Sequence, residues 1–260
     1  MKQRLITAIL SLIVFVPIVY MGSVILTTAV SLLGLIALFE LFRMRKQSLL
    51  SIEGLIAGSA LLLIIIPSNQ GVLGTAYSSS MLFYICALLL LISTVFSKNT
   101  FNFDDAAMSI LGSIYIGYGF KYFLLIRFEG LRLLLLALFI VWATDVGAYL
   151  VGRKFGKNKL APHISPNKTI EGSLGGIFCA LVISTGYYFS YPADFSFGMT
   201  ALLASLISVS GQLGDLVESA LKRHYDVKDS GKILPGHGGI LDRFDSILFA
   251  MPVLYLLTLV

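Results

Sequence analysis

The sequence predicts an all-α integral membrane protein, a polytopic bundle of about nine transmembrane helices with a cytoplasmic N-terminus. Of its 260 residues, 57% are hydrophobic and only 13% are charged, whereas a soluble domain carries about 25% charged residues. Apolar runs of about 20 residues, the length that a membrane helix needs, recur between short polar stretches. No basic stripe lies on a soluble domain, so a nucleic-acid partner is not expected.

The apolar run Leu5–Leu41 is too long for one span, and Gly22 allows a tight turn near Tyr20–Ser23 that divides it into two. Basic residues flank both ends of this pair, so the positive-inside rule places both ends in the cytoplasm. The further spans that we expect are Ile52–Ile66, Ser79–Phe96, Ala106–Ile126, Leu133–Val151, Gly172–Phe189, Phe197–Leu216 and Ile240–Leu257. This alternation puts the C-terminus outside and two polar loops, residues 152–169 and 220–239, in the cytoplasm.

The polar, glycine-rich stretch Gly211–Asp245 lies between two apolar runs and organises the chain. The expected topology brings five carboxylates from three spans to one depth on the cytoplasmic face. They are Asp145, Asp215, Glu218, Asp242 and Asp245. Because both basic loops lie on that face too, the pattern predicts a functional site: a membrane protein rarely keeps ionisable groups beside its apolar core without a function.

On a helix, Asp215 would share one face with Glu218, Ser219 and Lys222. Carboxylates suit a hard cation such as Mg²⁺, which takes one or two protein carboxylates and shares the phosphate oxygens of its substrate. The alternative is that Asp215 forms an interfacial ion pair with Lys222 or Arg223. The residues alone favour neither interpretation.

Asp242 and Asp245 share a face at the start of the last span. Acidic residues at a helix N-terminus interact favourably with the helix dipole, so capping is one explanation of Asp242. Capping accounts poorly for Asp245 and Arg243, which lie further into the helix. Two carboxylate pairs from two helices, joined by a loop rich in cations, favour a metal–phosphate site.

The loop between these helices supplies groups that bind phosphate. Its cations are Lys222, Arg223, Lys228 and Lys232. The turn that contains Gly238 and Gly239 lets backbone N–H groups approach an anion, although such a turn is often only a turn. We assign His237 to phosphate contact rather than to acid catalysis.

A second motif begins at Ser165 and precedes the seventh span. Asn167, Lys168 and Thr169 offer polar groups at a helix N-terminus, where free N–H groups bind phosphates. The alternative is an ordinary N-cap by Thr169, with Glu171 in the first turn.

These motifs together resemble the signature of the phosphatidate cytidylyltransferases, also called CDP-diacylglycerol synthases. The resemblance covers about Trp142–Asp245, while the first half is similar only in its hydrophobic spans. We therefore expect N-terminal helices in residues 1–130 and a catalytic region in residues 131–260. The stretches that carry the resemblance are Trp142–Tyr149, Ser165–Gly172, Ser219–Arg223, Lys228–Gly231 and Leu234–Asp245.

The resemblance implies a homodimeric enzyme of the cell membrane that makes CDP-diacylglycerol and pyrophosphate from CTP and phosphatidic acid. It implies that Asp215 and Asp242 hold Mg²⁺, and it leaves open a second ion such as K⁺. Asp145, Asp229 and Asp245 are further candidate ligands or supporting residues. The cations expected to hold phosphate groups at the cytoplasmic surface are Lys168, Lys222, Arg223, Lys228 and Arg243.

Three other interpretations compete with this one. A transporter or channel would string its acidic residues across the membrane, whereas here they lie at one depth. A different CTP-using enzyme, such as a polyisoprenoid kinase, is disfavoured by the unbroken Ser219–Asp245 signature. A lipid-binding scaffold would need neither the paired acids nor the glycine-rich turn.

Overall fold

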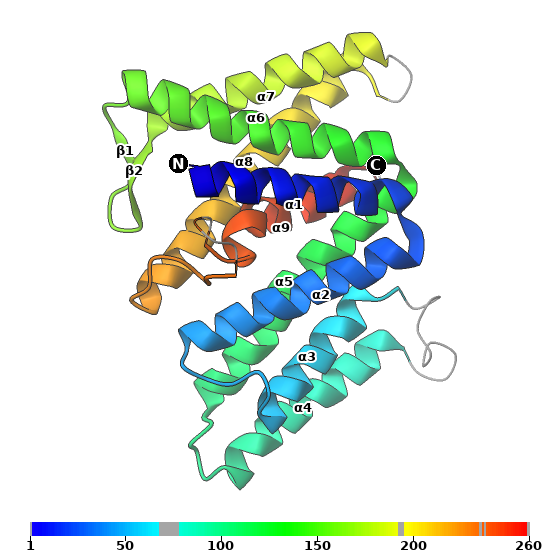
Figure 1. Ribbon diagram of the computed structural model, residues 1–260, viewed down its shortest axis with the longest axis vertical. Coiled ribbons are helices and arrows are strands. Elements are labelled where there is room, and N and C mark those ends of the chain that lie inside the picture. The colour runs from blue at the N-terminus through cyan, green and yellow to red at the C-terminus, as the bar shows by residue number, and fades with distance from the viewer. Residues whose placement is uncertain (1, 68–77, 192–194, 234–235, 237, 259–260) are drawn as a thin grey trace. The chain divides into compact units, whose positions relative to one another are not determined.

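The computed structural model describes residues 2–67, 78–191, 195–233, 236 and 238–258 (Figure 1). Within these residues lie nine α-helices and one antiparallel pair of strands, which confirms the all-α class. Six of the helices (α2 and α4 to α8) are long and apolar enough to cross a membrane. The elements are α1 (Lys2–Met21), α2 (Ser23–Met44), α3 (Ile52–Ile65), α4 (Ser79–Phe96), α5 (Phe103–Glu129), α6 (Leu131–Phe155), β1 (Lys159–Ala161), β2 (Ser165–Thr169), α7 (Ile170–Ser190), α8 (Phe197–His224) and α9 (Leu241–Thr258).

The chain folds as two compact units. Unit 1 contains Met1–Leu124 and Asp229–Leu241, and unit 2 contains Leu125–Lys228 and Asp242–Val260. Helix α5 therefore passes from one unit to the other, and α9 belongs to unit 2 except for its first residue. The division into two halves near residue 130 stays a prediction.

In unit 1, the expected turn between the first two helices is confirmed at Gly22. Its φ of 63° lies in the left-handed region that favours glycine, and it separates α1 from α2. Helix α2 packs closely on α3 at Gly34. A Cβ atom added to Gly34 would lie only 2.6 Å from Cδ1 of Ile65. Helix α5 is joined to α3 by Ser113, whose buried hydroxyl donates to the carbonyl of Ala57 at 3.0 Å.

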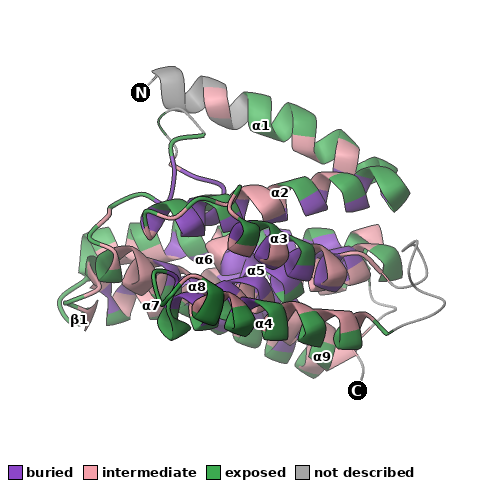
Figure 2. Ribbon diagram, turned by 90° about the horizontal axis from the view of Figure 1, so that it is seen from below, coloured by how far each residue is buried: buried purple, intermediate pink, exposed green. Residues whose placement is uncertain are grey.

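Helix α4 presents most of its apolar surface outward. Among its residues only Leu90 is buried (Figure 2). An apolar helix of 18 residues with this exposure suits contact with lipid, since hydrocarbon satisfies apolar side chains as well as a protein core does.

In unit 2, α6 and α7 run side by side at very close range (Figure 1). A Cβ at Gly147 would lie 2.6 Å from Sγ of Cys179, and one at Gly176 would lie 2.8 Å from the carbonyl oxygen of Thr144. Small residues at these positions let two membrane helices approach closely. Thr144 also donates to the hydroxyl of Ser208 at 2.9 Å, which links α6 to α8.

Three polar stretches are more ordered than the sequence predicts. Helix α6 continues to Phe155 and α8 to His224, although the spans were expected to end at Val151 and Leu216. The expected loop 152–169 contains the β1–β2 hairpin. Hydropathy marks where a helix leaves the apolar layer, and it carries no signal for helical turns that continue into water.

Candidate active site

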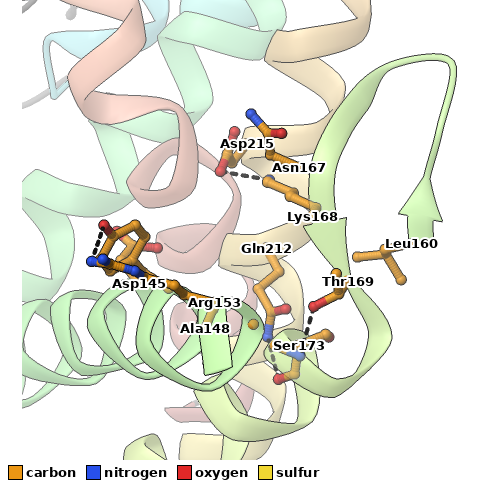
Figure 3. A pocket seen from close by; sticks show the side chains of 13 residues that line it. Asp145, Ala148, Arg153, Leu160, Asn167, Lys168, Thr169, Ser173, Gln212 and Asp215 are labelled. Carbon is orange, nitrogen blue, oxygen red and sulfur yellow. Dashed lines mark hydrogen bonds and ion pairs between the residues drawn. The ribbon is translucent and has the colours of Figure 1, made fainter. Parts of the chain in front are cut away.

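A pocket of about 480 Å³ opens in unit 2 beside α6, α7, α8 and strand β2 (Figure 3). It brings together residues from both predicted motifs. Nζ of Lys168, on β2, lies 2.5 Å from Oδ2 of Asp215, on α8. The predicted site residues that line it are Asp145, Asn167, Lys168, Thr169 and Asp215. The alternative pairing of Asp215 with Lys222 or Arg223 is not the one the structure shows.

The hairpin that carries Lys168 is held by capping interactions at the start of α7. Oγ1 of Thr169 accepts a hydrogen bond from the N–H of Gly172 at 3.1 Å, as the N-cap interpretation expects. The carboxylate of Glu171 accepts from the N–H groups of Lys157 and Asn158 at 3.1 and 3.2 Å. Thr169 and Glu171 therefore stabilise the start of α7, next to Lys168. The binding of substrate by Thr169, which also lines the pocket, stays a prediction.

Lys222 is the centre of a second ion-pair cluster in the same unit. Its ammonium group contacts Glu218 one helical turn earlier on α8 and lies 2.6 Å from Oδ1 of Asp242 on α9. The Glu218 side chain is fully buried, at 0% exposed, and that of Asp242 is 6% exposed. One lysine thus contacts two carboxylates from two helices, so these residues form a bridge between α8 and α9.

Electrostatic interactions join both ion-pair groups to Asp145, Asp245 and Arg243. When all are ionised, the cluster holds five carboxylates and three cations, which leaves two negative charges. We name this set the acidic cluster. Its members are Asp145, Asp215, Glu218, Asp242, Asp245, Lys168, Lys222 and Arg243.

The acidic cluster fits a divalent cation by charge and by donor type. Among the described residues, no three His, Cys, Asp or Glu side chains are placed to hold a metal by themselves. Mg²⁺ does not need such a group, because it takes one or two carboxylates and completes its shell with water and phosphate oxygens. Asp215 and Asp242 are suited to this role, since each already binds a cation, its lysine.

The remaining predicted residues do not line the pocket. Ser165 pairs with Ala161 within the hairpin, and Arg223 donates to the carbonyl oxygens of Ile164 and Val227 at 3.3 and 3.4 Å. Lys228 is exposed in unit 2.

Four further predicted residues belong to unit 1 or are not described. Asp229, Gly238 and Gly239 lie in unit 1. Gly238 has a φ of 86°, a backbone conformation that suits glycine. His237 lies outside the described residues, so its assignment stays a prediction.

Sequence reasoning missed several residues of the pocket. Gln212 lines it, and its amide donates to the carbonyl of Ser173 at 3.3 Å (Figure 3). Tyr149 and Arg153 lie on the α6 side and hydrogen-bond to each other at 3.4 Å. Helical spacing offers one signal: Gln212 is three residues before Asp215 and so shares its face of α8.

Comparison with known proteins covers the whole chain. A model of the family described as "Cytidylyltransferase family" matches residues 2–260. A protein named phosphatidate cytidylyltransferase from Bacillus subtilis (strain 168) is 49% identical over 99% of this chain and 97% of its own length. Proteins of the same name from Staphylococcus haemolyticus and Staphylococcus aureus (strain COL) are 47% and 48% identical, each over 99% of this chain and 98% of their own lengths. The similarity therefore includes the first half, where the sequence motifs gave no signal.

Proposed function

The chain belongs to the cytidylyltransferase family, and we propose that it transfers the CMP moiety of CTP to phosphatidic acid. The products are CDP-diacylglycerol, a precursor for phospholipid biosynthesis, and pyrophosphate. The observation that carries this proposal is the identity of 49% with a protein named phosphatidate cytidylyltransferase along almost the full length of both chains. The proposal includes a homodimer, which a mass measurement in detergent tests.

The pocket supports this chemistry. One substrate is a lipid and the other a soluble nucleotide, so their reaction needs a site at a membrane surface. The expected topology puts Asp215 and Lys168 near that surface, and the structure brings the two side chains together. Arg153 adds a second cation to the pocket lining. Cations paired with acids beside an open cavity suit the binding of a nucleoside triphosphate together with a divalent metal.

In the reaction, a phosphate oxygen of phosphatidic acid attacks the α-phosphorus of CTP. A new P–O bond forms, the bond from that phosphorus to the bridging oxygen breaks, and its electron pair leaves with pyrophosphate. The lipid phosphate is largely ionised at neutral pH, so no strong general base is needed. Catalysis then depends on positioning and charge stabilisation, for which Lys168 and Lys222 provide donors.

We include Mg²⁺ in the proposal, held by Asp215 and Asp242, with Asp145 and Asp245 near enough to add negative charge. Bound there, it would offset charge that develops on the phosphate oxygens. A second ion such as K⁺ is part of the same proposal. The excess of carboxylates over cations in the acidic cluster supports a bound cation, since a metal ion there would favour the ionised form of each carboxylate.

The direct test is an assay of the purified protein with phosphatidic acid, Mg²⁺ and each nucleoside triphosphate in turn. We expect CDP-lipid and an equal amount of pyrophosphate with CTP or dCTP only, and loss of both products when a chelator removes the metal. Folded protein that yields no product with any nucleotide would contradict the proposed function and revive the transporter interpretation.

We also propose that the pocket faces the cytoplasm across the plasma membrane. The basic residues of the 152–169 segment support this, because basic residues concentrate on the cytoplasmic side. Helix α6 has 25 residues and is about 37 Å long at 1.5 Å per residue, which is long enough for its two ends to reach opposite sides of a membrane.

Cysteine labelling tests this orientation. In a variant that lacks Cys86 and Cys179, the substitution Lys159→Cys is expected to resist a membrane-impermeant thiol reagent in intact cells and to react after lysis. Glu129→Cys, at the end of α5 and so near the opposite end of α6 from Lys159, is the matched control and should react in intact cells. Labelling of the cysteine at position 159 in intact cells would show the opposite orientation.

A further inference from the structure

Glu40 is a buried acid that the sequence analysis did not consider. It lies on α2 and is 1% exposed. A carboxylate buried in an apolar helix is costly unless hydrogen bonds satisfy it. Glu40 accepts hydrogen bonds from the N–H groups of Ile240 and Leu241, both at 2.9 Å, and from the hydroxyl of Ser230 at 3.2 Å.

These donors come from both ends of one segment, Ser230–Leu241, which lies within the predicted Ser219–Asp245 signature. Leu241 is the first residue of α9. The first N–H groups of a helix have no partner within the helix, and a carboxylate there interacts favourably with its dipole. Glu40 therefore holds the two ends of the segment together and caps the helix that follows.

Two glycines in the segment are explained by this contact. A Cβ at Gly231 would lie 2.7 Å from Cδ and 3.0 Å from Cγ of Glu40, and one at Gly239 would lie 2.5 Å from Cδ. Real Cβ atoms essentially never approach carbon atoms so closely, so any larger residue at either position would displace the Glu40 carboxylate from the place it occupies here. Gly239, which the sequence analysis assigned to a phosphate-binding turn, is required here for a different reason.

We propose that Glu40 is a positioning residue for the cytidylyltransferase reaction, acting by fixing the Ser230–Leu241 segment. Asp242, a candidate metal ligand, follows Leu241 directly in the chain. The hydrogen bond that holds the backbone of Leu241 therefore also restrains the backbone of Asp242. The inference rests on the proposed function. It gives a role to the N-terminal half, which carries no recognisable motif of its own.

The first test compares Glu40→Gln with wild-type protein and with Glu53→Gln, a matched change on α3. Because the amide nitrogen cannot accept the hydrogen bonds, we expect faster hydrogen exchange in the peptide 229–241 and unchanged exchange in α7. We expect kcat/KM for CTP to fall about 10- to 100-fold, the usual range for residues that support a ligand. Part of the loss should be a higher KM for CTP, with the KM for phosphatidic acid unchanged.

The KM values separate positioning from folding, because a misfolded fraction lowers kcat and changes neither KM. Faster exchange with both KM values unchanged, or wild-type kinetics in Glu40→Gln, would overturn the positioning role. Absence of activity in the wild-type protein would overturn the proposed function itself, and this inference with it.

Gly231→Ala tests the same role while keeping every hydrogen-bonding group. We expect a loss of kcat/KM for CTP similar to that of Glu40→Ala, because the new methyl group displaces the carboxylate. In a variant that already carries Glu40→Ala, the methyl group has room. Adding Gly231→Ala to that variant should lower kcat/KM for CTP by less than about threefold. Losses that multiply in the double variant would show that the two residues act independently.

Discussion

Asparagine in place of Asp215 or Asp242 is expected to lower CTP turnover by at least about a hundredfold, the usual loss when one charge-stabilising group is removed from an active site. Each substitution removes a negative charge and a hard oxygen ligand from the acidic cluster. It also leaves a lysine, Lys168 or Lys222, without one carboxylate partner. The measurement is steady-state turnover of purified protein over a range of Mg²⁺ concentrations.

Both variants are expected to fold and to insert into the membrane. Asparagine has nearly the volume of aspartate, the Asp215 side chain is 34% exposed, and Lys222 keeps Glu218 as a partner when Asp242 is changed. The matched control is Asp226→Asn, which changes an exposed residue at a φ of 54°, where asparagine is well tolerated. Near-normal turnover in either folded variant would refute the metal assignment.

The order of the helices was predictable because hydrophobic length is a local property of the sequence. Ser79–Phe96 agrees at both ends with α4, where a capping serine precedes the helix and a polar run follows it. The interior helix α5 begins three residues earlier and ends three residues later than predicted. The turns at the ends of such helices contain polar residues, so a search for apolar runs stops before the helix ends.

The pairing of charges was not predictable, because it depends on which helices meet. The sequence suggests ion-pair partners for Asp215 on its own helix. In the structure its partner is Lys168, which lies 47 positions earlier on a short strand. Glu40 was accessible to sequence reasoning in principle. It is a lone acid in an apolar run, and an ionisable residue within a membrane span is a functional candidate by default.

The substitution Lys222→Met is expected to destabilise the protein strongly. It removes the cation from Glu218, which is fully buried, and loss of one partner of a buried ion pair costs about 3–5 kcal/mol. Thermal unfolding of the purified protein in detergent measures this loss. Lys157→Met, an exposed lysine of the α6–β1 connection, is the control and should unfold at the wild-type temperature.

A second substitution separates the structural role of Lys222 from its role in catalysis. In Lys222→Met with Glu218→Gln no unpaired charge remains at position 218, so part of the lost stability should return, while Asp242 still lacks its contact with the lysine. If Lys222 also binds substrate phosphate, turnover should stay at least about a hundredfold below wild type in this partly restabilised protein. Recovery of both stability and turnover would show instead that Lys222 serves only to neutralise Glu218. Asp242 would then act in the site without the lysine that contacts it in this structure.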